Sequence, residues 1–149
     1  MTASNLTSRS TAAGAIAVTL ALLAGCGPSR PATYPVTGKV VFPDGSTLPG
    51  GMVEFESISA EGRPVNARGP IAEDGTFFLS TFQPGDGALP GEHRALVRPP
   101  VPDVDVEEGE RPPPAMLDRK YERYETSDLQ FSVQEGENQI TINVTRPGR

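Results

Sequence analysis

Short runs in which apolar and polar residues alternate occupy most of the chain after residue 34, and turn-forming residues separate these runs. Alternation with a period of two places apolar side chains on one face of a β-strand. The pattern predicts seven strands, at residues 36–42, 53–56, 65–72, 76–81, 92–98, 128–133 and 140–145. The third prediction is the weakest, because Asn66, Arg68 and Gly69 dilute its apolar positions.

Seven short strands over residues 34–146 fit an all-β, seven-stranded Greek-key β-sandwich, which needs about 100 residues. The turn at residues 135–138 is expected to join the last two strands as a hairpin. The inward-facing apolar positions form the expected core: Val36, Val40, Phe42, Val53, Phe55, Phe77, Leu79, Ala95, Val97, Leu129, Phe131, Val133, Ile140, Ile142 and Val144.

The N-terminal segment has a different character, with Arg9 as its single charge before position 30 and an apolar run from Ala12 to Ala24. A run of this length is too short to span a bilayer and is typical of the core of a signal peptide. It ends in Leu-Ala-Gly-Cys at residues 23–26. Residues 1–25 are therefore expected to be a signal peptide, and the alternative is a buried helix that ends in a chance cysteine.

The tetrapeptide at residues 23–26 resembles the lipobox of bacterial lipoproteins. The resemblance implies cleavage between Gly25 and Cys26 and lipidation of the Cys26 thiol, so that the membrane becomes a partner through this lipid. Two or three acyl chains give a stable anchor, whereas one chain binds marginally. Since Gly27 and not Asp follows the cysteine, we expect a lipid-anchored protein of the bacterial cell envelope, at the outer membrane or facing the periplasm. Residues 26–33 would be the lipidated cysteine and a tether, and residues 147–149 a short tail.

The amino-acid composition excludes several classes of fold and function. The 16 glycines and 16 prolines argue against a helical bundle. The net charge of −6 becomes −7 when residues 1–25 are removed, because one base and no acid are lost, and this acidity argues against nucleic-acid binding. One cysteine excludes an internal disulfide framework, and the single histidine excludes sites that need two.

Residues 99–127 interrupt the strand pattern. Six prolines lie within residues 99–114, and five acids lie within residues 103–110. We expect a long exposed loop, with a helical turn or two within residues 115–125. Asp103, Asp105, Glu107 and Glu108, with the nearby Glu110, are weak candidates for a Ca²⁺ site, since oxygen ligands suit this ion. The favoured alternative is a solvated charge run, so we assign no metal and no cofactor.

Four segments together resemble carboxypeptidase regulatory-like (transthyretin-like) domains. They are the stretches at residues 35–42, 48–55, 72–77 and 89–97. In addition, Lys120-Tyr121 followed by residues 126–129 is similar to a stretch of small secreted planctomycete lipoproteins that carry this domain. The resemblance implies a β-sandwich that serves as an accessory, adhesion, carbohydrate-contacting or spacer module.

Enzymes of the wider fold use paired histidines, and this chain has His93 alone. His93 shares an apolar face with Ala95 and Val97, which favours a core histidine over a general base. We therefore expect a non-enzymatic structural or protein-interaction module, with an unknown envelope protein or glycan as partner. The alternative is a carbohydrate- or Ca²⁺-responsive domain that uses exposed aromatics, unless the segment 99–127 covers them. The candidates are Tyr34, Phe78, Phe82, Tyr121 and Tyr124.

Overall fold

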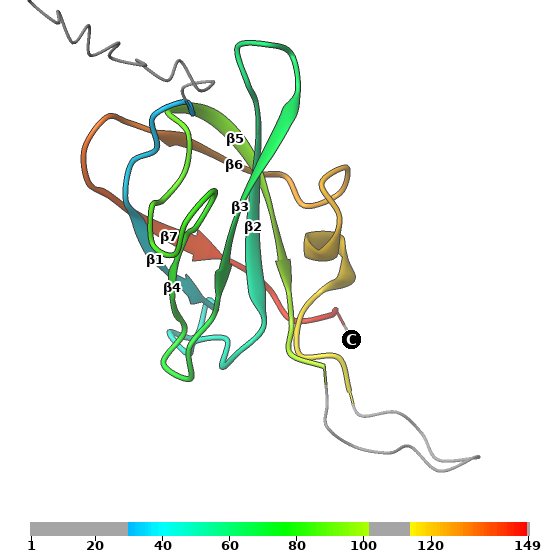
Figure 1. Cartoon of the computed structure of the whole chain (residues 1–149). Coiled ribbons are helices and arrows are strands. Elements are labelled where there is room, and N and C mark those ends of the chain that lie inside the picture. The colour runs from blue at the N-terminus through cyan, green and yellow to red at the C-terminus, as the bar shows by residue number, and fades with distance from the viewer. Residues whose placement is uncertain (1–29, 102–113, 149) are drawn as a thin grey trace, which may run out of the picture.

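The computed structural model describes residues 30–101 and 114–148, which fold into two β-sheets (Figure 1). The three-stranded sheet has the order β4-β1-β7, and the four-stranded sheet has the order β3-β2-β5-β6. The strands are β1 (Val36–Val41), β2 (Met52–Ile58), β3 (Pro64–Pro70), β4 (Thr76–Phe78), β5 (Gly91–Arg98), β6 (Leu129–Val133) and β7 (Asn138–Asn143). The predicted all-β sandwich is confirmed in this form. No helix in the described ranges is long and apolar enough to cross a bilayer.

Strand β1 is the centre of the smaller sheet. It pairs antiparallel with β4 and parallel with β7, whereas all pairs in the larger sheet are antiparallel. Two isolated bridges, Arg68 with Ser80 and Ile71 with Phe77, connect β3 to the chain around β4. The two sheets are therefore joined along one side, and the β3–β4 turn holds β4 in place beside β1.

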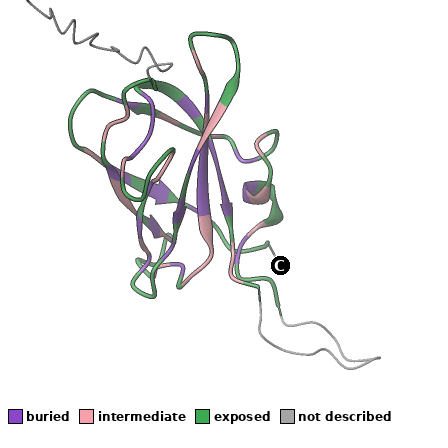
Figure 2. Cartoon of the chain, in the orientation of Figure 1, coloured by how far each residue is buried: buried purple, intermediate pink, exposed green. Residues whose placement is uncertain are grey.

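The core lies between the two sheets, where the buried strand residues meet (Figure 2). Every expected core residue is buried except Leu129 and Phe131, which are half-buried and pack against the core. The Phe131 ring stacks on Phe55 with a centroid distance of 5.3 Å and an interplanar angle of 4°. Among the described residues, the pattern missed eight buried hydrophobic residues, which lie mainly outside the predicted strand faces: Leu48, Ala67, Ile71, Ala88, Leu89, Leu96, Leu117 and Tyr121.

The predicted hairpin between the last two strands is wrong, because β6 and β7 belong to different sheets. Val133 pairs with Gly91 of β5, and Asn138 pairs with Val36 of β1. The turn between them is tight, since the Asn138 side chain accepts a hydrogen bond from the Gln134 amide at 2.8 Å. Local alternation predicts a strand and a turn, but it does not show which sheet edge each strand joins.

The segment 114–128 has the helical turn predicted within residues 115–125, but it packs against the sandwich and is not wholly an exposed loop. It contains a short 3₁₀ turn, η1 (Arg119–Glu122), which begins where the Asp118 carboxylate accepts a hydrogen bond from the Lys120 amide at 3.0 Å. Leu117 and Tyr121 are buried in the core cluster. The segment therefore covers part of the four-stranded sheet. Residues 1–29 and 102–113, with the signal peptide, Cys26 and the candidate Ca²⁺ ligands, lie outside the described residues.

Candidate functional site

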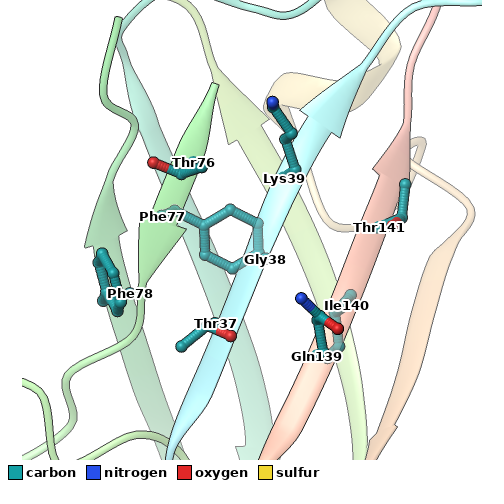
Figure 3. Close-up of a pocket in the computed structure, with 9 residues that line it drawn as sticks. All are labelled: Thr37, Gly38, Lys39, Thr76, Phe77, Phe78, Gln139, Ile140 and Thr141. Atoms are coloured by element: carbon teal, nitrogen blue, oxygen red, sulfur yellow. The ribbon is translucent and has the colours of Figure 1, made fainter. Parts of the chain in front are cut away.

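The outer face of the three-stranded sheet carries two rows of side chains that cross all three strands (Figure 3). In one row Thr37 of β1 lies between Phe78 of β4 and Gln139 of β7. In the other, Lys39 lies between Thr76 and Thr141, and these six side chains line a shallow groove of about 490 Å³. We call this surface the Thr/Phe face. Neighbouring strands are about 4.8 Å apart, so each row spans about 10 Å.

Gly38 makes this arrangement possible from the inner side of the sheet. A Cβ atom at Gly38 would overlap the backbone carbonyl oxygen of Ile140 and the ring of Phe77. Phe77, which is 1% exposed, therefore packs directly beneath β1, where any other residue would displace it. The buried Phe77 ring and the exposed Phe78 ring are consecutive on β4 and lie on opposite faces of the sheet (Figure 3).

The turn before β4 fixes the position of Thr76. The Asp74 carboxylate accepts hydrogen bonds from the Thr76 hydroxyl at 2.6 Å and from the Thr76 amide at 3.0 Å. These bonds hold the pKa of Asp74 below its usual range, with the positive charge of Lys39 as a smaller contribution. The Thr76 hydroxyl therefore donates its hydrogen to Asp74, and its oxygen can still accept a hydrogen bond from a partner.

Phe78 is the most accessible of the candidate aromatic residues. Its side chain is 62% exposed, and Phe82 is 39% exposed. Tyr121 is buried, while Tyr34 and Tyr124 are half-buried. Tyr121 and Tyr124 belong to the segment 114–128 and pack with it against the sandwich. The face combines one exposed phenyl ring with hydroxyl, amide and ammonium groups, which suits a partner that has both apolar and hydrogen-bonding surface.

A second cluster, on the outer face of the four-stranded sheet, surrounds the buried carboxylate of Glu54. Glu54 is 3% exposed and accepts hydrogen bonds from Asn66 at 2.8 Å, Arg68 Nε at 3.0 Å and the Tyr124 hydroxyl at 2.9 Å. Arg98 lies 3.7 Å from the same carboxylate. Burying a carboxylate is unfavourable unless hydrogen bonds and opposite charges surround it, and here they do.

Tyr124 connects this cluster to the covering segment. The Arg94 guanidinium lies 4.8 Å from the Tyr124 ring centroid and also contacts Glu56 at 2.6 Å. Burial and the hydrogen bond to Glu54 raise the pKa of Tyr124 well above its usual range, so the phenol stays protonated as a donor. The cluster fastens the segment 114–128 to the sheet. Sequence reasoning missed it, although the outward positions of β2 carry acids and those of β3 and β5 carry arginines.

His93 lies inside the sandwich, as its apolar face predicts, with 3% of its surface exposed. Its Nε2 lies 2.7 Å from the carbonyl oxygen of Leu89. Because a carbonyl only accepts, Nε2 carries the proton, and Nδ1 of the neutral ring is an acceptor. Burial, the largest influence, lowers the pKa of His93. Nδ1 is buried and finds no partner among the described residues, so this atom is not presented to a substrate.

Within residues 30–101 and 114–148, no three His, Cys, Asp or Glu side chains gather closely enough to hold a metal ion. Comparisons with protein-family models, with curated proteins and with solved structures found no match. The assignment of function therefore depends on the chain's own surfaces, and the Thr/Phe face, with its exposed Phe78 ring, is the candidate that we choose.

Proposed function

We propose that this chain is a non-catalytic, lipid-anchored module of the bacterial cell envelope that binds a partner protein through the Thr/Phe face. In this proposal the sandwich is of the Greek-key, transthyretin-like type, and Cys26 carries the lipid after cleavage of residues 1–25. The observation that carries the binding role is Phe78, a 62% exposed ring on a strand whose other large side chain is buried.

The rigidity of the face supports a binding role. Thr37, Lys39 and Thr76 are held in register by hydrogen-bonded strands, so little backbone order has to be gained on binding. An exposed aromatic ring at the edge of an otherwise polar surface is the type of residue that is enriched in protein interfaces. Of the six side chains of the Thr/Phe face, Lys39 alone is charged, so few charges lose their water when a partner binds.

A photo-crosslinking experiment in the source cells tests the binding role. A photoreactive residue at Thr141 should give a discrete protein adduct that Phe78→Ala abolishes and Phe82→Ala preserves. The same photoreactive residue at Met116, an exposed position away from the face, is the matched control. An adduct that is insensitive to Phe78→Ala, or equally strong at Met116, would rule out the face as the interface.

The anchor has its own test. Cys26→Ser should move the protein from the membrane fraction to the soluble fraction without changing the fold. An unchanged distribution between the two fractions would overturn the lipid anchor and leave the crosslinking result unaffected.

A carbohydrate is the second candidate partner, because Phe78 lies beside the hydroxyls of Thr37 and Thr76, and the Gln139 amide lies on the other side of Thr37 in the same groove. A phenyl ring next to such groups offers a stacking surface with hydrogen bonds for sugar hydroxyls. Thermal unfolding in the presence of envelope glycans discriminates the two candidates. A ligand-dependent rise in Tm that Phe78→Ala removes would favour the glycan over the protein partner.

A further inference from the structure

One end of the sandwich brings together the start of the described chain and two loops. Arg30 and Pro31 lie there with Phe82 and with the hairpin between β2 and β3. Pro31, Ser59, Arg63 and Phe82 line one shallow groove of about 240 Å³. Figure 1 shows the coloured chain beginning at the same end of the molecule as the tip of the β2–β3 hairpin. We call this the Arg30 end.

The length of the tether limits where this end can lie. Only four residue steps separate Cys26 from Arg30, so Arg30 lies at most about 14 Å from the lipid-bearing cysteine even when the chain is fully extended. The opposite end of the sandwich carries Met116 and Arg146. The eight residues of β5 alone span about 26 Å between the two ends.

The Arg30 end also has the chemistry of a surface that contacts lipid. Phe82 is 39% exposed and Ile58, at the base of the hairpin, is 64% exposed. The Arg30 guanidinium lies 5.9 Å from the Phe82 ring centroid, and Arg63 lines the adjoining groove. Aromatic rings beside basic side chains are favoured where apolar chains meet phosphate headgroups.

We propose that the Arg30 end rests on the phospholipid surface, with Phe82 and Ile58 at the level of the headgroups and Arg30 and Arg63 on their phosphates. This orientation rests on the proposed lipidation of Cys26. It turns the opposite end away from the membrane. Acidic residues also lie at this end: Glu61 lines the same groove as Arg63, and Glu92, Glu135 and Glu137 flank the neighbouring strand ends. We therefore place the contact on the side of Phe82, where the Arg30 guanidinium lies.

The absence of tryptophan from the chain allows a sharp test. The lipidated mature protein, as Phe82→Trp, is reconstituted into vesicles of phosphatidylethanolamine and phosphatidylglycerol that contain an acyl-brominated phosphatidylcholine. Met116→Trp, at the opposite end and 41% exposed against 39% for Phe82, is the matched control. We expect quenching and a blue shift of the emission for Phe82→Trp, no change for Met116→Trp, and weaker quenching when Arg30→Glu is added to Phe82→Trp.

The outcomes separate this proposal from the anchor. If both proteins float with the vesicles and Phe82→Trp is not quenched, the contact is wrong and the anchor stands. If both tryptophans are quenched equally, the domain lies on its side and the proposed orientation is wrong. If neither protein floats with the vesicles, the lipidation of Cys26 fails and the orientation fails with it.

Discussion

The hydroxyl of Tyr124 donates a hydrogen bond of 2.9 Å to the buried carboxylate of Glu54, which precedes it by 70 positions. This bond joins the covering segment 114–128 to the outer face of the four-stranded sheet. Leu96, on the same outward face of β5 as Arg94, is 2% exposed as a result. One face of the larger sheet is thus partly closed, while the Thr/Phe face of the smaller sheet stays open.

Removal of the Tyr124 hydroxyl should destabilise the fold. Tyr124→Phe leaves the buried carboxylate of Glu54 with one donor fewer, while the donors Asn66 and Arg68 remain. We therefore expect the free energy of unfolding to fall by roughly 1–2 kcal/mol, which is toward the lower end of the range for hydrogen bonds to charged groups. Urea unfolding measures this loss. Tyr121→Phe is the control, since its hydroxyl faces the neutral Thr145 hydroxyl at 3.3 Å and should cost less than about 1 kcal/mol. Equal losses would show that the charge of Glu54 adds nothing to the Tyr124 bond.

A methyl group at Gly38 should disturb both strand neighbours of β1. Gly38→Ala places a Cβ atom against the Ile140 carbonyl oxygen, which belongs to the backbone of β7, and against the buried Phe77 ring, so one of them has to shift. We expect a loss of about 2–4 kcal/mol in the free energy of unfolding, as for overpacked cores at the upper end of the usual range. Gly45→Ala is the control, because Gly45 has a φ of 82° and open space around it. It should lose only about 1 kcal/mol from the left-handed backbone. A Gly38→Ala loss no larger than that of Gly45→Ala would contradict the close packing of Phe77 under β1.

The strands and most of the core follow from local alternation, because each strand buries one face. Alternation fails where a second layer covers the outward face, as at Leu96, and where a loop residue such as Leu48 reaches the core. The alternation of apolar and polar residues also cannot show that β6 and β7 belong to different sheets, since strand pairing depends on contacts between residues that are distant in sequence.

The candidate site was only partly predictable for the same reason. The outward positions of Thr37 and Lys39 are visible in the sequence, and Phe78 stands out because it faces away from Phe77. These residues form one face because β1 pairs with both β4 and β7. No pattern of neighbouring residues in the sequence predicts the parallel pairing of β1 with β7. The Glu54 cluster likewise joins residues of β2, β3, β5 and the segment 114–128.

The buried His93 should make stability depend on pH in a narrow window. Its pKa is lowered in the folded state, so the unfolded chain binds the proton more readily, and stability is complete above about pH 6.5 and falls as the pH drops toward the folded-state value. The slope should reach at most about 1.4 kcal/mol per pH unit. Urea unfolding at pH 7.5, 6.5 and 5.5 measures it, and His93→Gln should abolish the slope while keeping a donor for Leu89. The carboxylates with lowered pKa values, Asp44, Glu61 and Asp74, lose their contribution only at lower pH. A slope that persists in His93→Gln would assign the pH dependence to another group.

The loop that carries Phe82 should depend on one carboxylate. Asp86 accepts hydrogen bonds from the backbone amides of Thr81 at 2.7 Å, Phe82 at 3.0 Å and Gln83 at 2.9 Å. Asp86→Ala removes, from a half-buried position, the two carboxylate oxygens that accept these three bonds, and we expect a loss of about 1–3 kcal/mol and faster hydrogen exchange at the three amides. Asp44→Ala is the control at the opposite end, where Asp44 accepts two bonds from Ser46 in an exposed turn. It should leave the exchange at residues 81–83 unchanged. If Asp86→Ala also leaves that exchange unchanged, the carboxylate does not hold the loop, and the position of Phe82 depends on its packing beside Arg30 and the β2–β3 hairpin instead.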